Sequence, residues 1–169
     1  MSYNLEQGSG YTAQFGNAVY ANSGGANTNI STTNATTYTI GGVQYNVAAL
    51  AAAAAPTTDV RTGVAPVALL GAQACVFVIG LNASGALRFV QGPVVSFPSG
   101  AAAGDVVMSL PAMPANFCPI AYQVIKNKNT AGTAAWTYGT SNFNASNVAS
   151  ETAVQIHTLP NVAITNAAA

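Results

Sequence analysis

Short apolar stretches alternate along this chain with stretches rich in Gly, Pro and Asn. Residues 74–81 (Ala-Cys-Val-Phe-Val-Ile-Gly-Leu) are apolar throughout, as in a central strand that is covered on both faces. A four-residue turn, Asn-Ala-Ser-Gly, leads to residues 86–91, whose Leu87 and Phe89 share one face. The pattern therefore predicts a strand–turn–strand unit at the centre of the fold.

A second pair of strands is predicted at residues 106–110 and 120–125, which are rich in β-branched and aromatic residues. Pro111, Pro114 and Pro119 lie between them. Proline excludes a helix there and cannot donate to a sheet. We therefore expect a rigid, extended corner that ends at the last proline.

A β-hairpin is predicted at residues 36–47, where Thr-Tyr-Thr-Ile and Val-Gln-Tyr-Asn-Val flank a Gly-Gly pair. Two glycines tolerate the positive φ angles of a two-residue type I′ turn. This register places Tyr38 opposite Tyr45 and Ile40 opposite Val43, and the tyrosine pair would support it.

Further strands are predicted at residues 94–97, 135–138 and 152–158. The Ala-rich run at residues 48–55 ends before a proline and predicts a two-turn helix, with an extended strand as the alternative. Short strands with Gly, Pro and Asn turns predict an all-β protein, either an antiparallel β-sandwich or a jelly-roll-like barrel.

Three parts of the chain differ in composition. Residues 1–36 are polar and low in complexity, residues 37–160 hold the predicted β-rich domain, and residues 161–169 form a tail. The first part lacks the periodicity of a packed element, so we expect a flexible arm. Large aromatic side chains on such an arm suit anchoring on a partner, although they are equally compatible with a disordered tail: Tyr3, Tyr11, Phe15 and Tyr20.

Charged residues are rare. Only 5% of the 169 residues are charged, against about 25% in ordinary soluble proteins, and the formal net charge is zero. This composition fits a neutral secreted domain, or a chain whose surface is largely covered by other chains; we favour the second and expect a homo-oligomer. The four cations are spread over different parts of the chain, with only Lys126 and Lys128 close in sequence, and cannot follow a nucleic-acid backbone.

Targeting signals are not visible either. No run reaches about 18 consecutive apolar residues, so no membrane-spanning segment is predicted. The N-terminus, Met-Ser-Tyr-Asn-Leu-Glu-Gln, lacks a basic region followed by an apolar one. We therefore expect synthesis in the cytoplasm without a signal peptide.

Catalytic and metal-binding patterns are not apparent, and we predict neither an enzyme nor a cofactor or metal site. The lone His157 lies on the polar face of an alternating strand. Cys75 and Cys118 lie in apolar strands without a second Cys or a His at metal-ligand spacing, which favours buried small hydrophobes over a disulfide. A two-carboxylate site would need to combine distant residues: Glu6, Asp59, Asp105 and Glu151.

Five stretches form a recognisable succession of turns and strands. They are Val-Gln-Tyr, Asn-Ala-Ser-Gly-Ala-Leu-Arg-Phe-Val-Gln-Gly, Leu-Pro-Ala-Met-Pro-Ala-Asn-Phe-Cys-Pro-Ile-Ala-Tyr-Gln-Val-Ile-Lys-Asn, Trp-Thr-Tyr-Gly-Thr-Ser-Asn-Phe-Asn-Ala and Thr-Leu-Pro. This succession, across residues 36–160, resembles virion surface proteins of tailed bacteriophages, usually described as head fibre, head decoration or cement proteins. The resemblance implies a β-rich protein, commonly trimeric, that is attached to the major capsid protein or other virion proteins on the capsid exterior.

Two other functions fit a β-rich oligomer. A receptor- or glycan-binding module of a tail fibre should expose aromatic and polar side chains at one tip, and one loop is a candidate: Trp136, Tyr138, Asn142, Phe143 and Asn144. A bacterial surface or fimbrial subunit is a third hypothesis, against which the missing signal sequence counts. The sequence favours a structural protein of the virion.

Overall fold

A computed structural model describes residues 13–14, 20–22, 28–98, 106–128, 130, 132–155 and 164–166. These residues form strands, turns and loops, and no helix occurs among them. All strand pairs are antiparallel, which confirms the all-β prediction. Within the same ranges, no helix has the length and apolar character needed to cross a membrane.

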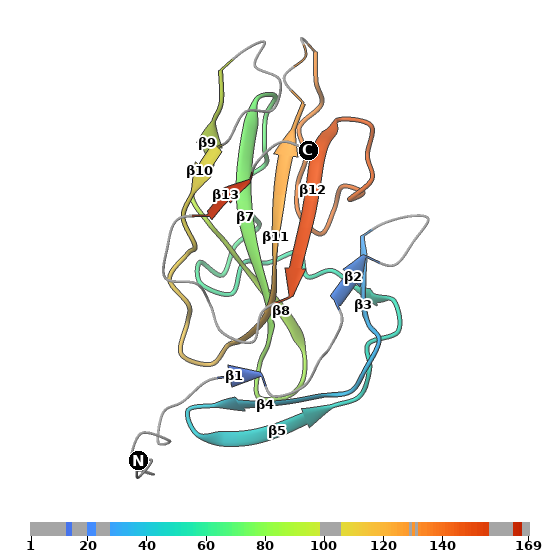
Figure 1. The fold of residues 1–169 in the computed structure, drawn as a ribbon, viewed down its shortest axis with the longest axis vertical. Helices are drawn as coiled ribbons and strands as arrows, with labels where there is room; N and C mark the ends of the chain where they lie inside the picture. The colour runs from blue at the N-terminus through green and yellow to red at the C-terminus, as the bar shows by residue number, and fades with distance from the viewer. Residues whose placement is uncertain are drawn as a thin grey trace.

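The strands of the described residues form four sheets (Figure 1). Their order is β1-β4-β5, β2-β3-β6, β10-β13 and β12-β11-β7-β8, with β9 paired to β7. The bounds are β1 (Ala13–Gln14), β2 (Tyr20–Asn22), β3 (Asn29–Thr32), β4 (Thr36–Ile40), β5 (Val43–Val47), β6 (Ala53–Ala54), β7 (Gln73–Leu81), β8 (Leu87–Gln91), β9 (Val95–Ser96), β10 (Val106–Met108), β11 (Cys118–Asn127), β12 (Val148–Gln155) and β13 (Ile164–Asn166).

Strand β7 lies at the centre of the largest sheet, between β8 and β11. Every residue of β7 after Gln73 is buried, as the run of apolar residues predicts. Because side chains alternate along a strand, β7 contributes to two separate cores. The first we call the aromatic core; its buried rings are Tyr38, Phe77, Phe89, Trp136, Tyr138 and Phe143. The second we call the valine core; its members include Val76, Val78, Val90, Val124, Phe97, Met108 and Phe117.

The β4–β5 hairpin forms in the predicted register. Tyr38 pairs with Tyr45, and their rings stack with centroids 5.6 Å apart. Gly41 and Gly42 have φ angles of 58° and 83°, as a type I′ turn requires. The Tyr38 hydroxyl donates a 2.7 Å hydrogen bond to the Asn82 carbonyl, which ties the hairpin to the turn that follows β7.

The Ala-rich run does not form the predicted helix. Ala52 has a φ of 50°, and the two residues after it form β6, which pairs with β3. Thr32 donates its N–H to the Leu50 carbonyl, and Leu50 donates its N–H to the Thr32 hydroxyl, both at 2.9 Å. A two-turn helix of alanines has little apolar surface to bury, so strand pairing outweighs its helix propensity.

The predicted arm boundary at residue 36 is also wrong. Strand β3 lies before it, and Ile30 of that strand is completely buried in the aromatic core. Backbone pairing extends further back, since β2 pairs with β3 and β1 pairs with β4. Partner strands supply the burial that this segment could not provide alone.

The proline corner ends earlier than predicted. Strand β11 begins at Cys118, so that Pro119 lies inside it, opposite Gly80 of β7. The register with β7 shifts between Pro119 and Ala121, and the described part of β12 pairs with β11 from Ala121 onward. Pro119 therefore occupies an irregular part of the strand, where its missing N–H costs little.

The C-terminal third departs from the prediction in three places. Instead of a strand at residues 135–138, Trp136 forms an isolated bridge with Leu69. Strand β12 begins at Val148, before the predicted start at residue 152, and residues 156–158 lie outside the described residues. Within the predicted tail, Ile164–Asn166 forms β13 and pairs with β10.

Candidate functional site

The loop proposed for receptor recognition does not expose its aromatic residues. Trp136 and Tyr138 are completely buried and Phe143 is 1% exposed, so that prediction is wrong. The Tyr138 and Phe77 rings stack at 4.7 Å, and the Trp136 indole N–H donates to the Asn142 carbonyl at 2.8 Å. Asn142 and Asn144 are exposed, but no aromatic ring of this loop is exposed beside them. The spacing of Trp136 and Tyr138 predicted that their side chains share one face. It did not show that this face points into the core.

The proposed attachment residues of the arm remain predictions. Tyr3, Tyr11 and Phe15 lie outside the described residues. Tyr20 begins β2, and nothing is described of its side chain.

A loop around Asp59 holds a buried carboxylate that accepts three backbone hydrogen bonds. One carboxylate oxygen of Asp59 accepts the Arg61 N–H at 2.7 Å and the Thr62 N–H at 3.3 Å. The other accepts the Gln91 N–H at 2.8 Å. Asp59 is 2% exposed, and these bonds replace the water that burial removes.

This loop covers the outer edge of β8. Asp59 and Phe89 form a parallel bridge, and the Val60 N–H donates to the Phe89 carbonyl at 3.0 Å. The next N–H group of β8 that points away from the sheet belongs to Gln91, and it donates to the Asp59 carboxylate. The loop thus protects an edge strand from pairing with another chain. The sequence predicts a loop at Asp59 but not this role; the signal that could have found it is the Asp itself, whose side chain can accept the N–H two residues further on in an Asx turn.

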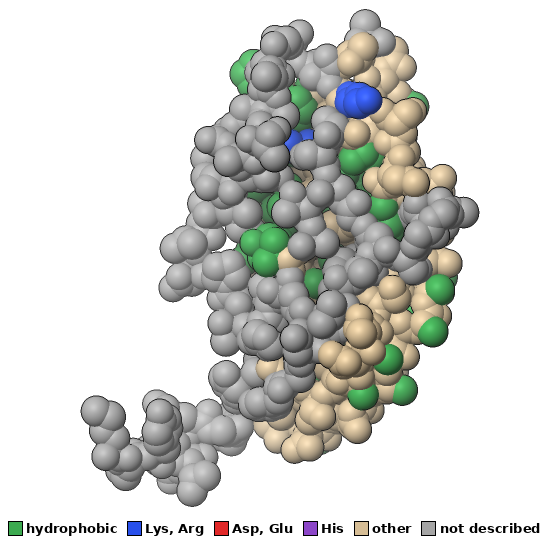
Figure 2. Space-filling view, turned by 45° about the vertical axis from the view of Figure 1, so that its right-hand side comes forward, with side chains coloured by type: hydrophobic (Ala, Val, Ile, Leu, Met, Phe, Trp, Pro, Cys, Tyr) green, Lys and Arg blue, Asp and Glu red, His purple; other side chains and the backbone are tan. Residues whose placement is uncertain are grey.

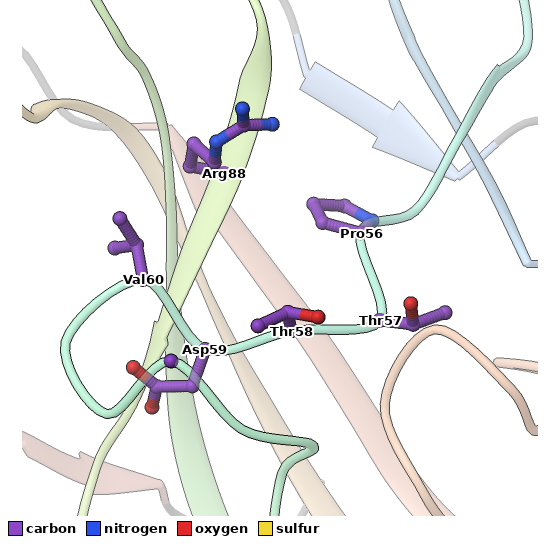
Figure 3. A pocket seen from close by; sticks show the side chains of 7 residues that line it. Pro56, Thr57, Thr58, Asp59, Val60 and Arg88 are labelled. Carbon is purple, nitrogen blue, oxygen red and sulfur yellow. The ribbon is translucent and has the colours of Figure 1, made fainter.

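A cleft lies beside this loop (Figure 3). Its volume is about 500 Å³, and we call it the Arg88 cleft; its lining is Pro56, Thr57, Thr58, Asp59, Val60, Gly63 and Arg88. Arg88 projects from β8 and is partly buried, while both threonines are exposed. The arrangement places a cation and two hydroxyl groups around one hollow, which suits an anionic or strongly polar ligand.

A second cleft of about 360 Å³ lies on the other side of Asp59 and is lined by Arg61, Val67 and Gln91 among others. Its arginine is held by the protein, since a guanidinium N–H of Arg61 donates to the Gln91 carbonyl at 3.1 Å. The Gln91 side chain exchanges two hydrogen bonds with the Val67 backbone, at 2.7 and 2.8 Å. These groups therefore fix the chain that crosses β8.

Exposed apolar side chains gather in the segment that forms the rim of this second cleft. Val64 is 61% exposed, Val67 65% and Leu70 57%. We call these three residues the apolar strip. The only other large apolar side chain with comparable exposure among the described residues is Val43, at 55%, in the β4–β5 hairpin. In the face drawn in Figure 2, Lys and Arg occupy small areas, and no acidic side chain is visible among the described residues.

The two thiols are buried and free, as predicted. Burial raises the pKa of both Cys75 and Cys118 to about 12, so both remain protonated near neutral pH. Such thiols pack as small hydrophobic side chains and are poor nucleophiles. Among the described residues, no group of three or more His, Cys, Asp and Glu side chains lies together.

Comparison of the chain with protein-family models, with curated proteins and with solved structures finds no match.

Proposed function

We propose that this chain is a non-enzymatic structural protein of a bacteriophage particle. It would decorate or cement the capsid exterior as a homo-oligomer, most simply a trimer, and contact the major capsid protein. Its site of action would be the virion, after synthesis in the host cytoplasm. The resemblance of residues 36–160 to phage head proteins supports this proposal, as does the scarcity of charge, at 5% of residues.

The apolar strip is the observation that carries the proposal. Three large apolar side chains on one segment, each more than half exposed, provide apolar surface that a partner chain could cover. Two residues from the strip, Val64 and Val67, also line the second cleft, so apolar surface continues into a hollow. A partner chain that covers the apolar strip would explain why a chain of zero net charge exposes these apolar side chains.

The fold that we propose is a β-sandwich or jelly-roll-like barrel. The central sheet is buried on both faces, and Ile30 and Tyr38 of β3 and β4 belong to its aromatic core. Antiparallel sheets with short connections are typical of both architectures. The alternative of a tail-fibre receptor-binding module relied on exposed aromatics in the loop at residues 136–144, and because these rings are buried we favour the decorating role.

A matched pair of variants tests the proposed interface. We expect Val67→Ser with Leu70→Ser to shift the purified chain from oligomer to monomer in native mass spectrometry. Val43→Ser, at an exposed valine elsewhere, should leave the oligomer unchanged. A wild-type chain that is monomeric at micromolar concentration would remove this support for the proposal.

The particle itself provides the second test. Quantitative mass spectrometry of purified phage that encodes the chain should find hundreds of copies per particle. A few dozen copies or fewer would indicate a tail protein instead, and absence from particles would contradict a structural role.

Attachment through the arm can be tested separately. We expect deletion of residues 2–12 to weaken binding to particles that lack the protein while the oligomer is retained. The deletion stops well before Ile30, because that residue belongs to the aromatic core and its loss would disturb folding. Full binding by the truncated chain would assign attachment to the β-rich domain.

A further inference from the structure

We propose that the Arg88 cleft is a binding site for an extended acidic peptide, with Arg88 pairing to a Glu or Asp carboxylate of the peptide. Arg88 lies on β8 opposite Gly80 of β7, so the paired strands fix its backbone. Its guanidinium donates one recorded hydrogen bond, to the Leu87 carbonyl at 3.0 Å. A guanidinium carries five N–H donors in a planar fork, which leaves donors for a bidentate carboxylate.

The neighbouring carboxylate of Asp59 is held by backbone groups and is not paired with this guanidinium. Both Asp59 oxygens are used by backbone N–H groups of Arg61, Thr62 and Gln91. Figure 3 shows the Asp59 carboxylate turned away from the Arg88 guanidinium. The described structure records no ion pair between the two residues. Arg88 therefore offers a positive charge in a hollow, where partial burial strengthens its attraction for an anion.

The walls of the cleft indicate a peptide. Thr57 and Thr58 are exposed and can exchange hydrogen bonds with a main chain, while Pro56 and Val60 give apolar contact. Among the described residues that line it there is no aromatic ring, so a sugar or nucleobase has no platform to stack on. A volume of about 500 Å³ lies within the usual range of ligand sites.

Nuclear magnetic resonance titration of the full-length, isotope-labelled chain tests the proposal. The probe is an end-blocked pentapeptide, Gly-Ser-Glu-Ser-Gly, and the matched control replaces its Glu by Gln. We expect saturable shifts at the amides of Thr57, Thr58 and Val60. The Gln peptide should bind at least about fivefold more weakly, and added salt should weaken the Glu peptide.

Variants then assign the charge. Arg88→Gln should weaken the Glu peptide at least about fivefold, and Arg88→Lys should lose less because it keeps the charge without the planar fork. Lys128→Gln, at an exposed cation that lines a different hollow, should bind as wild type. If Arg88→Gln does not fold, two measurements still test the proposal: the affinity of Arg88→Lys for the Glu peptide, and the comparison of the Glu and Gln peptides on the wild-type chain.

Three results would overturn the proposal: equal binding of the Glu and Gln peptides, shifts confined to residues outside the cleft, or equal affinity for free glucuronate. The last would indicate a saccharide site. The experiment uses the isolated chain, so its outcome does not depend on whether the virion assignment is correct.

Discussion

The two faces of the central sheet are built in different ways. In the aromatic core, Tyr138 packs against Phe77 and Phe89 with ring centroids 4.7 and 4.5 Å apart. The Trp136 N–H is fixed by the Asn142 carbonyl. The valine core presents mainly small, branched side chains from β7, β8 and β11, such as Val78, and is covered by segments that contribute few rings.

The difference appears in how closely the covering chain approaches. On the valine side, a Cβ added at Gly80 would collide with the Phe117 ring and the Cys118 carbonyl. At Gly92, an added Cβ would lie 2.9 Å from the Val76 carbonyl oxygen and 3.2 Å from that of Ser109. Large rings therefore fill the aromatic core. The valine core is instead closed by backbone atoms that lie directly over Gly80 and Gly92, together with the Phe117 ring over Gly80.

The largest effect is expected from a charge in the valine core. Val78 is completely buried at the centre of β7, so Val78→Asp would bury an unpaired carboxylate at a cost of several kcal/mol and prevent folding. Circular dichroism and soluble yield measure this. Val43→Asp, in an exposed position, is the control and should remain folded. A soluble Val78→Asp chain with wild-type melting would show that the valine core is dispensable.

The next effect compares the two cores directly. Trp136→Ala removes a completely buried ring and should lower the free energy of unfolding by about 3–5 kcal/mol. Val90→Ala in the valine core should cost about 2 kcal/mol, since it removes far less buried apolar surface than the loss of an indole ring. Urea unfolding followed by circular dichroism measures both. Equal losses would show that the aromatic core is no more strongly packed than the valine core.

Much of the local structure was predictable from the sequence because the deciding signals are local. The Gly-Gly turn, the Tyr38–Tyr45 pair and the apolar run of β7 each follow from neighbouring residues. The same signals failed where a distant strand decides the structure. Ala53 and Ala54 form β6 because β3 is available to pair with them, and Ile30 is buried because the sheets bring a core to it.

The candidate site was less predictable than the fold. Arg88 could be placed on the face opposite Leu87 and Phe89, but its partly exposed position in a cleft depends on the loop at residues 56–63. The alternation of Trp136 and Tyr138 likewise identified a shared face without its direction. A side chain's face follows from strand period, whereas what covers that face depends on contacts distant in sequence.

A smaller effect is expected where the valine core touches glycine. Gly80→Ala must displace the Phe117 ring or the Cys118 backbone, which should cost about 1–3 kcal/mol. Gly71→Ala is the control, because its added Cβ would make only ordinary contacts of 3.4 Å or more. The control should change stability by less than about 0.5 kcal/mol. If both variants melt as wild type, the close approach at Gly80 is easily relieved.

The smallest effect near neutral pH concerns the two thiols, both of which lie on the aromatic side. Burial raises the pKa of Cys75 and Cys118 from 9.0 to about 12. The folded chain therefore holds these protons more tightly than the unfolded chain, so their contribution is complete below about pH 9 and is lost as the pH rises toward about 12.

Thiol labelling and alkaline unfolding test this together. At pH 8, a thiol reagent should leave the native chain unmodified and label both cysteines after unfolding in urea. Between about pH 9 and pH 12 the free energy of unfolding should fall, and the fall should be smaller in the Cys75→Ala, Cys118→Ala double variant. Tyr38, whose pKa burial also raises, remains in both proteins and so does not account for the difference. Rapid labelling of the folded chain would mean that the aromatic core opens readily in solution. Its interlocked rings would then describe how the core is packed, but they would not keep reagents out of it.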